Sequence, residues 1–282
     1  MRKRGLWRDA WQRLRRNRAA VVSLIVLAML AMAALFGPAL SPYAYDALDW
    51  RALAVPPGEG THWLGTDRLG RDLLVRTLHG TRISIAIALL ATTVSVLIGV
   101  GWGAVAGYVG GRLDALMMRI VDALYSLPYI FFVIVLTVLF GRSVVLLFIA
   151  IGAVGWLTMA RIVRGQTLSL RHKEFIEAAV VSGATTGHIL ARHVVPNVLG
   201  TVIVYASLII PQMILFESFL SFLGLGVQEP LASLGSLVAQ GAAEMESASW
   251  MLIVPAATLV ILLACFNFLG DGLRDALDPR TG

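Results

Sequence analysis

Few residues of this chain have the types and spacing that catalytic or metal chemistry requires. The single cysteine, Cys265, lies in an apolar run and offers neither a disulfide framework nor a cysteine metal cluster. Lys3 and Lys173 are the only lysines and neither follows a glycine, so the Gly-Lys end of a phosphate-binding loop is absent. The HExxH zinc motif is also absent, and the histidines fall in predicted loops or interfaces: His62, His79, His172, His188 and His193. We therefore predict no catalytic residue, no metal site and no cofactor bound by this chain.

The most informative polar segment runs from Arg171 to Asn197, which is too polar to span a membrane and too rich in helix formers to be a loose linker. Glu174 and Glu177 fall near the start of a helical stretch, where acidic side chains complement the helix dipole. Ala178 and Ala179 favour the helix and keep the next turn narrow. Such a turn can enter a groove in another protein.

The second half of this segment predicts a reversal and a second short helix. Gly183 permits a change of direction that a side chain would hinder. Ile189 and Leu190 can supply an apolar patch, and Pro196 is suited to opening the next helix. The segment as a whole predicts a helix, a turn and a helix that lie against the membrane.

Polar and small residues inside the apolar runs are the other candidates for function. Gln212 and Glu217 are candidates for a substrate pathway, because charged and polar groups are costly inside hydrocarbon. Glu217 has an alternative position at the outer water interface. Gly99, Gly103 and Gly107 recur every four residues, which predicts one helix face that another backbone can approach closely.

The composition indicates that the bilayer is the solvent of this protein. Hydrophobic residues make up 58% of the 282 residues and charged residues only 14%, which is too apolar for a soluble core. The net charge of +6 arises from basic residues that flank apolar runs, so we expect contact with anionic lipid and an intracellular partner and no nucleic-acid binding. We predict an all-α membrane protein with one membrane domain.

Apolar runs long enough to cross the bilayer predict six transmembrane helices. Each run can span ~30 Å of hydrocarbon at ~1.5 Å per residue. Pro128, Pro211 and Pro255 lie within runs and are expected to bend the helices. The runs lie near residues 19–40, 83–108, 117–140, 143–162, 198–222 and 250–270.

The charges between these runs predict their orientation. The segment from Arg161 to Arg192 is rich in arginine and is predicted inside, whereas Gly224 to Ser249 contains three glutamates and no Lys or Arg and is predicted outside. Both termini are then cytoplasmic. A cleaved signal peptide is the alternative for the first run, which is longer than the usual signal-peptide core.

These predictions divide the chain into consecutive segments. Between residues 62 and 82, Asp67, Arg68, Arg71 and Asp72 offer paired charges just before a span, either as an anchor or as a contact for a binding protein. Arg119 and Asp122 are expected to pair along one helix face. The segments are a basic cytoplasmic segment at 1–18, a first transmembrane helix at 19–40, an extracytoplasmic segment with an interfacial helix at 41–82, a five-helix core at 83–270 with the cytoplasmic loop 164–196, and a cytoplasmic tail at 271–282.

Several stretches resemble one family of membrane proteins, the permease subunits of ABC importers. Glu177-Ala178-Ala179, Gly183 and the later His193-Val194-Val195-Pro196 are similar to the EAA loop of these permeases, although the broad pattern ends in Ile-x-Leu-Pro. Leu234-Gly235 replaces the Trp-Gly that is common in relatives. Other stretches resemble the second permease of peptide and nickel importers: RRNRAAVVSLIVLAMLAMAALFGPALSPY, HWLGTDRLGRDLLVRTLHGTRISI and ESFLSFLGLGVQEP.

The resemblance implies a type I ABC importer permease fold in a bacterial inner membrane. It implies a loop that docks into the ATPase, with coupling residues Glu174, Glu177, Ala178, Ala179, Gly183 and Pro196. The implied partners are a second homologous permease, two cytoplasmic ATPase subunits that bind ATP and Mg, and an extracytoplasmic solute-binding protein.

Three alternatives to a peptide importer stay open at this point. A nickel or other small-solute importer would share the same loop and scaffold. A secondary transporter or channel would need midplane acidic residues, a filter motif or an inverted repeat, and none is evident. An intramembrane hydrolase would need a catalytic set within the spans, which the sequence lacks.

Overall fold

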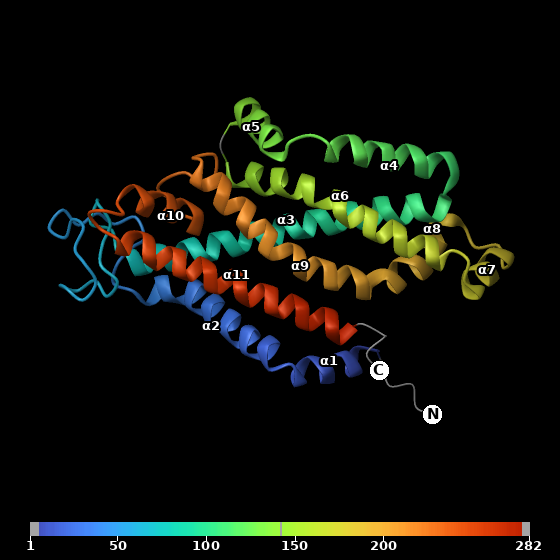
Figure 1. Ribbon diagram of the computed structural model, residues 1–282, viewed down its shortest axis with the longest axis horizontal. Coiled ribbons are helices and arrows are strands. Elements are labelled where there is room, and N and C mark those ends of the chain that lie inside the picture. Colours follow the sequence, from blue (N-terminus) through green and yellow to red (C-terminus); the bar gives the residue numbers. More distant parts are fainter. Residues whose placement is uncertain (1–5, 142, 278–282) are drawn as a thin grey trace.

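The computed structural model describes residues 6–141 and 143–277, and in this part of the chain the secondary structure is helical apart from one isolated bridge between Thr66 and Asp72. The first five residues of the predicted cytoplasmic segment 1–18 and the last five of the predicted tail 271–282 lie outside the described residues. The helices in Figure 1 are α1 (Leu6–Arg16), α2 (Arg18–Leu40), α3 (Leu73–Val109), α4 (Gly111–Tyr125), α5 (Tyr129–Phe140), α6 (Val144–Leu170), α7 (Glu174–Val181), α8 (Thr186–Ile189), the π-helix η1 (Leu190–Val194), α9 (Val195–Phe222), α10 (Leu234–Ala243) and α11 (Trp250–Leu277).

Within the described ranges, five helices are long and apolar enough to cross a membrane. They cover the predicted runs with the exception of 117–140, so the prediction of one continuous helix there is wrong. That run is divided into α4 and α5 at Ser126–Pro128. Pro128 donates no backbone hydrogen bond and disfavours helical geometry at Leu127, which turns the expected bend into a break. The spans are Arg18–Leu40, Leu73–Val109, Phe148–Leu170, Thr186–Phe222 and Trp250–Leu277.

The helix predicted in the segment 41–82 is present only at residues 73–82, where it is the start of α3 and not a separate element. Residues 41–72 form turns and bends, and α3 begins directly at Leu73. The Asp72 side chain caps α3 by accepting a hydrogen bond from the Val75 backbone N–H at 2.8 Å. Gly65 and Gly70 have φ values of 77° and 74°, which a helix does not tolerate.

Helix α3 packs along α6 in the middle of the bundle, and three glycines lie at this contact. A Cβ on Gly99 would come within 2.6 Å of the Met159 Cβ, and one on Gly103 within 2.4 Å of the Ala160 carbonyl oxygen. A Cβ on Gly107 would lie 2.8 Å from the Arg164 carbonyl oxygen. Only glycine allows the two backbones to approach this closely.

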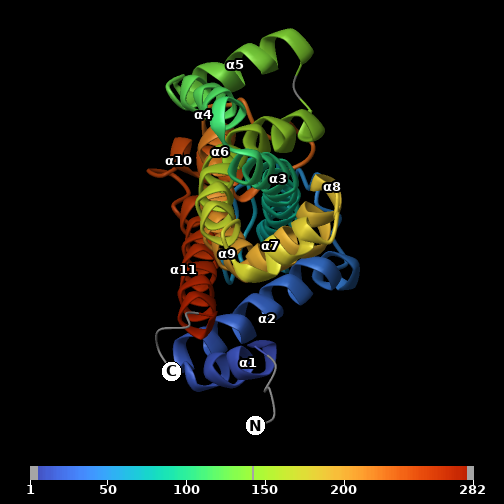
Figure 2. The same cartoon turned by 90° about the vertical axis from the view of Figure 1, so that its right-hand side faces the viewer.

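The bundle has two ends of different construction (Figure 1). Helices α1 and α7 and the last turns of α11 lie at one end, here called the loop end, while residues 41–72 and α10 lie toward the other, the cap end. Ala10 and Leu14 of α1 pack against Ala276 at the end of α11. Figure 2 places α4 and α5 on the side of the bundle opposite α1 and α2.

Candidate functional site

The loop between α6 and α9 contains a short helix that ends in a defined turn. After α7, the Gly183 N–H donates to the Val180 carbonyl at 2.9 Å and the Ala184 N–H donates to the Ala179 carbonyl at 3.0 Å. This pair of hydrogen bonds is the Schellman arrangement, which needs a left-handed residue at the position of Gly183. Gly183 has φ of 78°. The Thr185 side chain then caps α8.

This loop is anchored on one face and exposed on the other. Ile176 and Ile189 are buried in the main hydrophobic cluster. Glu174, Glu177, Ala178 and Gly183 are exposed, and Ala179 is half-buried. The apolar side chains at the tip are exposed as well: Phe175, Val180 at 53% and Val181 at 88%. An exposed apolar tip with two carboxylates beside it is typical of a contact surface for another protein.

The chain from Thr186 to Phe222 is a single continuous helix. Pro196 lies in the first turn of α9, yet it does not start a separate helix, because η1 joins α8 to α9 without interruption. The Val195 N–H reaches back five residues to the Leu190 carbonyl. This wider π turn directly before Pro196 accommodates a residue that cannot donate a backbone hydrogen bond.

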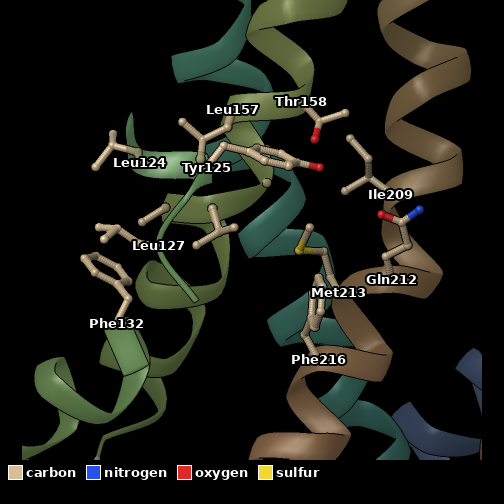
Figure 3. Close-up of a pocket in the computed structure, with 13 residues that line it drawn as sticks. Leu124, Tyr125, Leu127, Phe132, Leu157, Thr158, Ile209, Gln212, Met213 and Phe216 are labelled. Atoms are coloured by element: carbon tan, nitrogen blue, oxygen red, sulfur yellow. The ribbon is translucent and has the colours of Figure 1, made fainter. Parts of the chain in front are cut away.

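A cavity of about 340 Å³ lies where the break between α4 and α5 faces α6 and α9. Tyr125 ends α4 at the break, Thr158 belongs to α6, and Gln212 projects from α9 (Figure 3). Apolar side chains line the rest, including Phe132 and Met213. Gln212, one of the two predicted pathway residues, therefore lines a cavity.

Glu217, the other predicted pathway residue, does not line this cavity. Its side chain is 0% exposed, so the carboxylate has no contact with water in this structure. The alternative position at the depth of the outer water interface stays a prediction. Its carboxylate accepts hydrogen bonds from the Ser84 hydroxyl of α3 and the Ser221 hydroxyl of α9, both at 2.7 Å. Ser84 in turn accepts from the Leu234 N–H at the start of α10 at 3.1 Å. Glu217 thus ties three helices together.

Two charged pairs join α6 to α4 in the described part of the chain. Arg161 donates to Asp122 at 2.8 Å and lies over the Tyr125 ring, 4.5 Å from its centroid. The ionic partner of Asp122 is therefore Arg161, and the predicted pairing with Arg119 is wrong, because the partner comes from a neighbouring helix. Neither Arg161 nor Tyr125 was a sequence candidate, since only the packing of α4 on α6 brings them together.

A second pair joins the same two helices nearer the loop end. Arg164 binds both Asp114 carboxylate oxygens, at 2.6 and 2.7 Å. The hydrogen bonds from Arg164 hold the pKa of Asp114 below its ordinary value. This fork geometry fixes α4 on α6.

The charged residues of segment 41–72 pair at the cap end. Asp67 accepts from Arg71 Nε at 2.6 Å and lies 3.4 Å from Nε of the fully buried Arg76. His62 Nδ1 and Asp72 lie 2.8 Å apart. The paired charges anchor this segment to the bundle, and Arg68 reaches Glu244 near the end of α10. In the described part of the chain, no cluster of three or more His, Cys, Asp or Glu residues has the geometry to hold a metal ion.

Comparison with known proteins places this bundle in a family. Residues 99–282 match the family described as "Binding-protein-dependent transport system inner membrane component". Residues 5–57 match the family described as the N-terminal TM domain of oligopeptide transport permease C. The chain belongs to the inner-membrane permease components of binding-protein-dependent transport systems.

Curated relatives of this permease cover nearly the whole chain. The oligopeptide transport system permease protein OppC of Haemophilus influenzae is 56% identical over 278 residues, which is 98% of this chain and 89% of that protein. OppC of Escherichia coli K12 is 56% identical, over 98% of this chain and 92% of the relative. The dipeptide permease DppC of Bacillus subtilis is 44% identical, over 96% and 85%.

A solved structure shares the fold. The MetNI methionine ABC transporter in an inward-facing conformation aligns with a TM-score of 0.59 and 20% identity, over 73% of this chain and 96% of that chain. At this identity the likeness concerns the fold alone.

Proposed function

We propose that this chain is a permease subunit of an ATP-driven importer of peptides and forms half of the translocation pathway. The names and high identity of the oligopeptide and dipeptide relatives support the peptide cargo. A nickel or other small-solute importer is the second candidate, since the resemblance in the sequence extends to nickel importers. The chain itself performs no hydrolysis, and ATP and Mg belong to partner ATPase subunits.

The observation that carries the mechanism is the continuous helix from Thr186 to Phe222. The exposed turn around Gly183 lies before one end of this helix, and Gln212 faces the cavity farther along it. Movement of the loop by an ATPase is therefore transmitted along a stiff element into the cavity. Glu174, Glu177, Ala178, Ala179 and Gly183 form the coupling surface, and Pro196 lies in the first turn of α9, directly after the π turn that joins this surface to the helix.

The proposed assembly places the loop end in the cytoplasm of a bacterium. Both termini, α7 and the arginine-rich segment then lie inside, and the cap end faces outward, as the charge distribution favours. The partners are a second homologous permease, two ATPase subunits and an extracytoplasmic solute-binding protein. The close contact of α3 and α6 at Gly99, Gly103 and Gly107 serves as the rigid scaffold for this movement.

The coupling role is tested by Gly183→Val in the assembled complex, reconstituted in proteoliposomes. Valine at φ of 78° disrupts the turn, so we expect ATP-driven peptide uptake to fall at least tenfold while the chain still inserts in the membrane. Gly187→Val is the matched control, because Gly187 is exposed, has open space around it and has no positive φ. Normal uptake by the Gly183 variant contradicts the coupling role, and uptake by this chain alone without ATP contradicts the importer.

A further inference from the structure

Three neutral hydrogen-bonding groups meet at the cavity. Figure 3 shows the Tyr125 ring pointing toward the helix that carries Gln212, with the Thr158 hydroxyl on the side of the Tyr125 hydroxyl end. They come from three different helices, α4, α6 and α9. No one stretch of sequence could therefore reveal this group, which the packing at the α4–α5 break creates.

These three groups are without hydrogen-bond partners among the described residues. All three side chains are exposed in the single chain, although Thr158 and Gln212 belong to membrane-spanning helices. A side-chain amide without a hydrogen-bond partner is unfavourable in hydrocarbon, because it loses its hydrogen bonds to water and gains none in return. Their position becomes favourable when polar atoms of a ligand, of water or of the second permease satisfy these groups, and the open cavity gives a ligand access to them.

The rest of the cavity wall limits the chemistry of that ligand. The described side chains that line it carry no charge. Arg161, which lies over the ring of Tyr125, is not among the lining residues and is already paired with Asp122. Met213 and Phe216 provide an apolar and adaptable wall. Such a site cannot distinguish acidic from basic side chains.

A peptide backbone fits these properties. Each peptide unit offers one N–H donor and one carbonyl acceptor, and an amide side chain with two hydroxyls can satisfy both. The cavity volume of about 340 Å³ lies at the lower end of the range for small-molecule sites, as expected of one half of a pathway.

We propose that Gln212, Thr158 and Tyr125 form a transit site that hydrogen-bonds the backbone amides of a passing peptide, while the apolar wall accepts its side chains without selecting their charge. This inference rests on the proposed peptide import and adds the residues that contact the cargo within the membrane. The site explains how one pathway can carry peptides of varied sequence.

The test uses the complete complex in proteoliposomes with saturating binding protein. Three peptides of equal length carry neutral, acidic or basic side chains, and each is also made with one N-methylated backbone amide. We expect Gln212→Leu to lower the uptake of all three unmethylated peptides by a similar factor of about five, the equivalent of one hydrogen bond near 1 kcal/mol. The variant should also lose part of the wild-type preference for unmethylated peptides.

Further variants distinguish the hydrogen bonds of the Gln212 amide from the packing of its side chain. Gln212→Asn keeps an amide and should retain charge-independent uptake, whereas Gln212→Glu should make uptake depend on the charge of the peptide. Thr158→Val removes one hydroxyl at constant shape and should reproduce a smaller part of the loss. Every variant is tested with the same binding protein. The peptide preference of the binding protein is therefore the same in all measurements and does not affect the comparison between variants.

The outcomes distinguish this inference from the proposed function. Unchanged uptake by Gln212→Leu, a loss that depends on side-chain charge, or a loss of the second permease from the purified complex overturns the transit site. A wild-type complex that takes up no peptide overturns the proposed function itself.

Discussion

The charged side chains at the two ends of the bundle differ in burial and in ion pairing. At the cap end, Asp67, Arg71 and Arg76 are buried and paired with one another. At the loop end, Glu174 and Glu177 are exposed and have no ion-pair partner among the described residues. One end is complete within the single chain, whereas the other presents groups that another protein can satisfy.

Two glycines show the same contrast. Gly70 and Gly183 have similar φ values of 74° and 78°. A Cβ on Gly70 would meet the Asp49 carbonyl oxygen at 1.9 Å, while a Cβ on Gly183 would meet nothing within 4 Å. The cap end is closely packed around its turn, and the loop end leaves its turn open.

The largest effect on stability is expected from Asp67→Ala at the cap end. The substitution leaves two buried arginines without their shared carboxylate, which costs about 3 kcal/mol, at the lower end for a broken buried pair because Arg71 keeps Glu229. Chemical denaturation in detergent micelles measures this loss. Glu59→Ala, at an exposed position of the same segment, serves as the control.

A matched pair of glycine substitutions sharpens the contrast next. Gly70→Ala and Gly183→Ala each introduce strain of about 1 kcal/mol from the left-handed backbone. Only Gly70→Ala adds a backbone collision, so its free energy of unfolding should fall by clearly more than that of Gly183→Ala in the same denaturation assay. Equal losses at the two sites would remove the distinction between a packed and an open turn.

A smaller effect is expected from acid at the Asp114–Arg164 pair near the loop end. Because the pKa of Asp114 is lowered in the folded protein, the pair stabilises the fold above the ordinary value of 3.8, and this contribution is lost as the pH falls through the folded pKa. Thermal unfolding of wild type and Asp114→Asn between pH 5 and pH 3 measures it. The wild type should lose more stability than the variant, and parallel curves would exclude this contribution.

The smallest effect on stability is expected from Glu174→Gln with Glu177→Gln. Both side chains are exposed, so the free energy of unfolding should change by less than about 0.5 kcal/mol. Binding of the purified ATPase should weaken nonetheless, which surface plasmon resonance can measure. A large loss of free energy of unfolding with unchanged ATPase binding would contradict this contrast, because the two glutamates would then stabilise the fold as the charges of the cap end do.

The sequence predicted much of this fold because the bilayer imposes long apolar helices. The runs at 19–40 and 250–270 lie within α2 and α11, since length and hydropathy suffice to specify a spanning helix. Gly183 was placed at a reversal because few residues other than glycine adopt its backbone conformation. Pro128 was expected to bend a helix and instead divides it, because local rules do not measure how much neighbouring packing supports a bent helix.

The polar residues of the spans were beyond the reach of sequence reasoning. Gln212 and Glu217 lie on one helix and were both candidates for the pathway, yet one lines a cavity and the other is buried in a network of serines. The same holds for Asp122, whose partner Arg161 lies on another helix. The spacing of residues in the sequence predicts contacts within one helix, but it does not predict contacts between different helices.

The sequence by itself determined that the chain is a helical membrane protein with a polar loop that turns at Gly183, because hydropathy and turn residues act locally. Only the tertiary structure decided which polar groups are paired and which are free, because hydrogen bonds and cavities depend on contacts between distant segments. The glutamate at 217 became part of a three-helix junction, and Gln212 became part of a site with Thr158 and Tyr125, through packing alone.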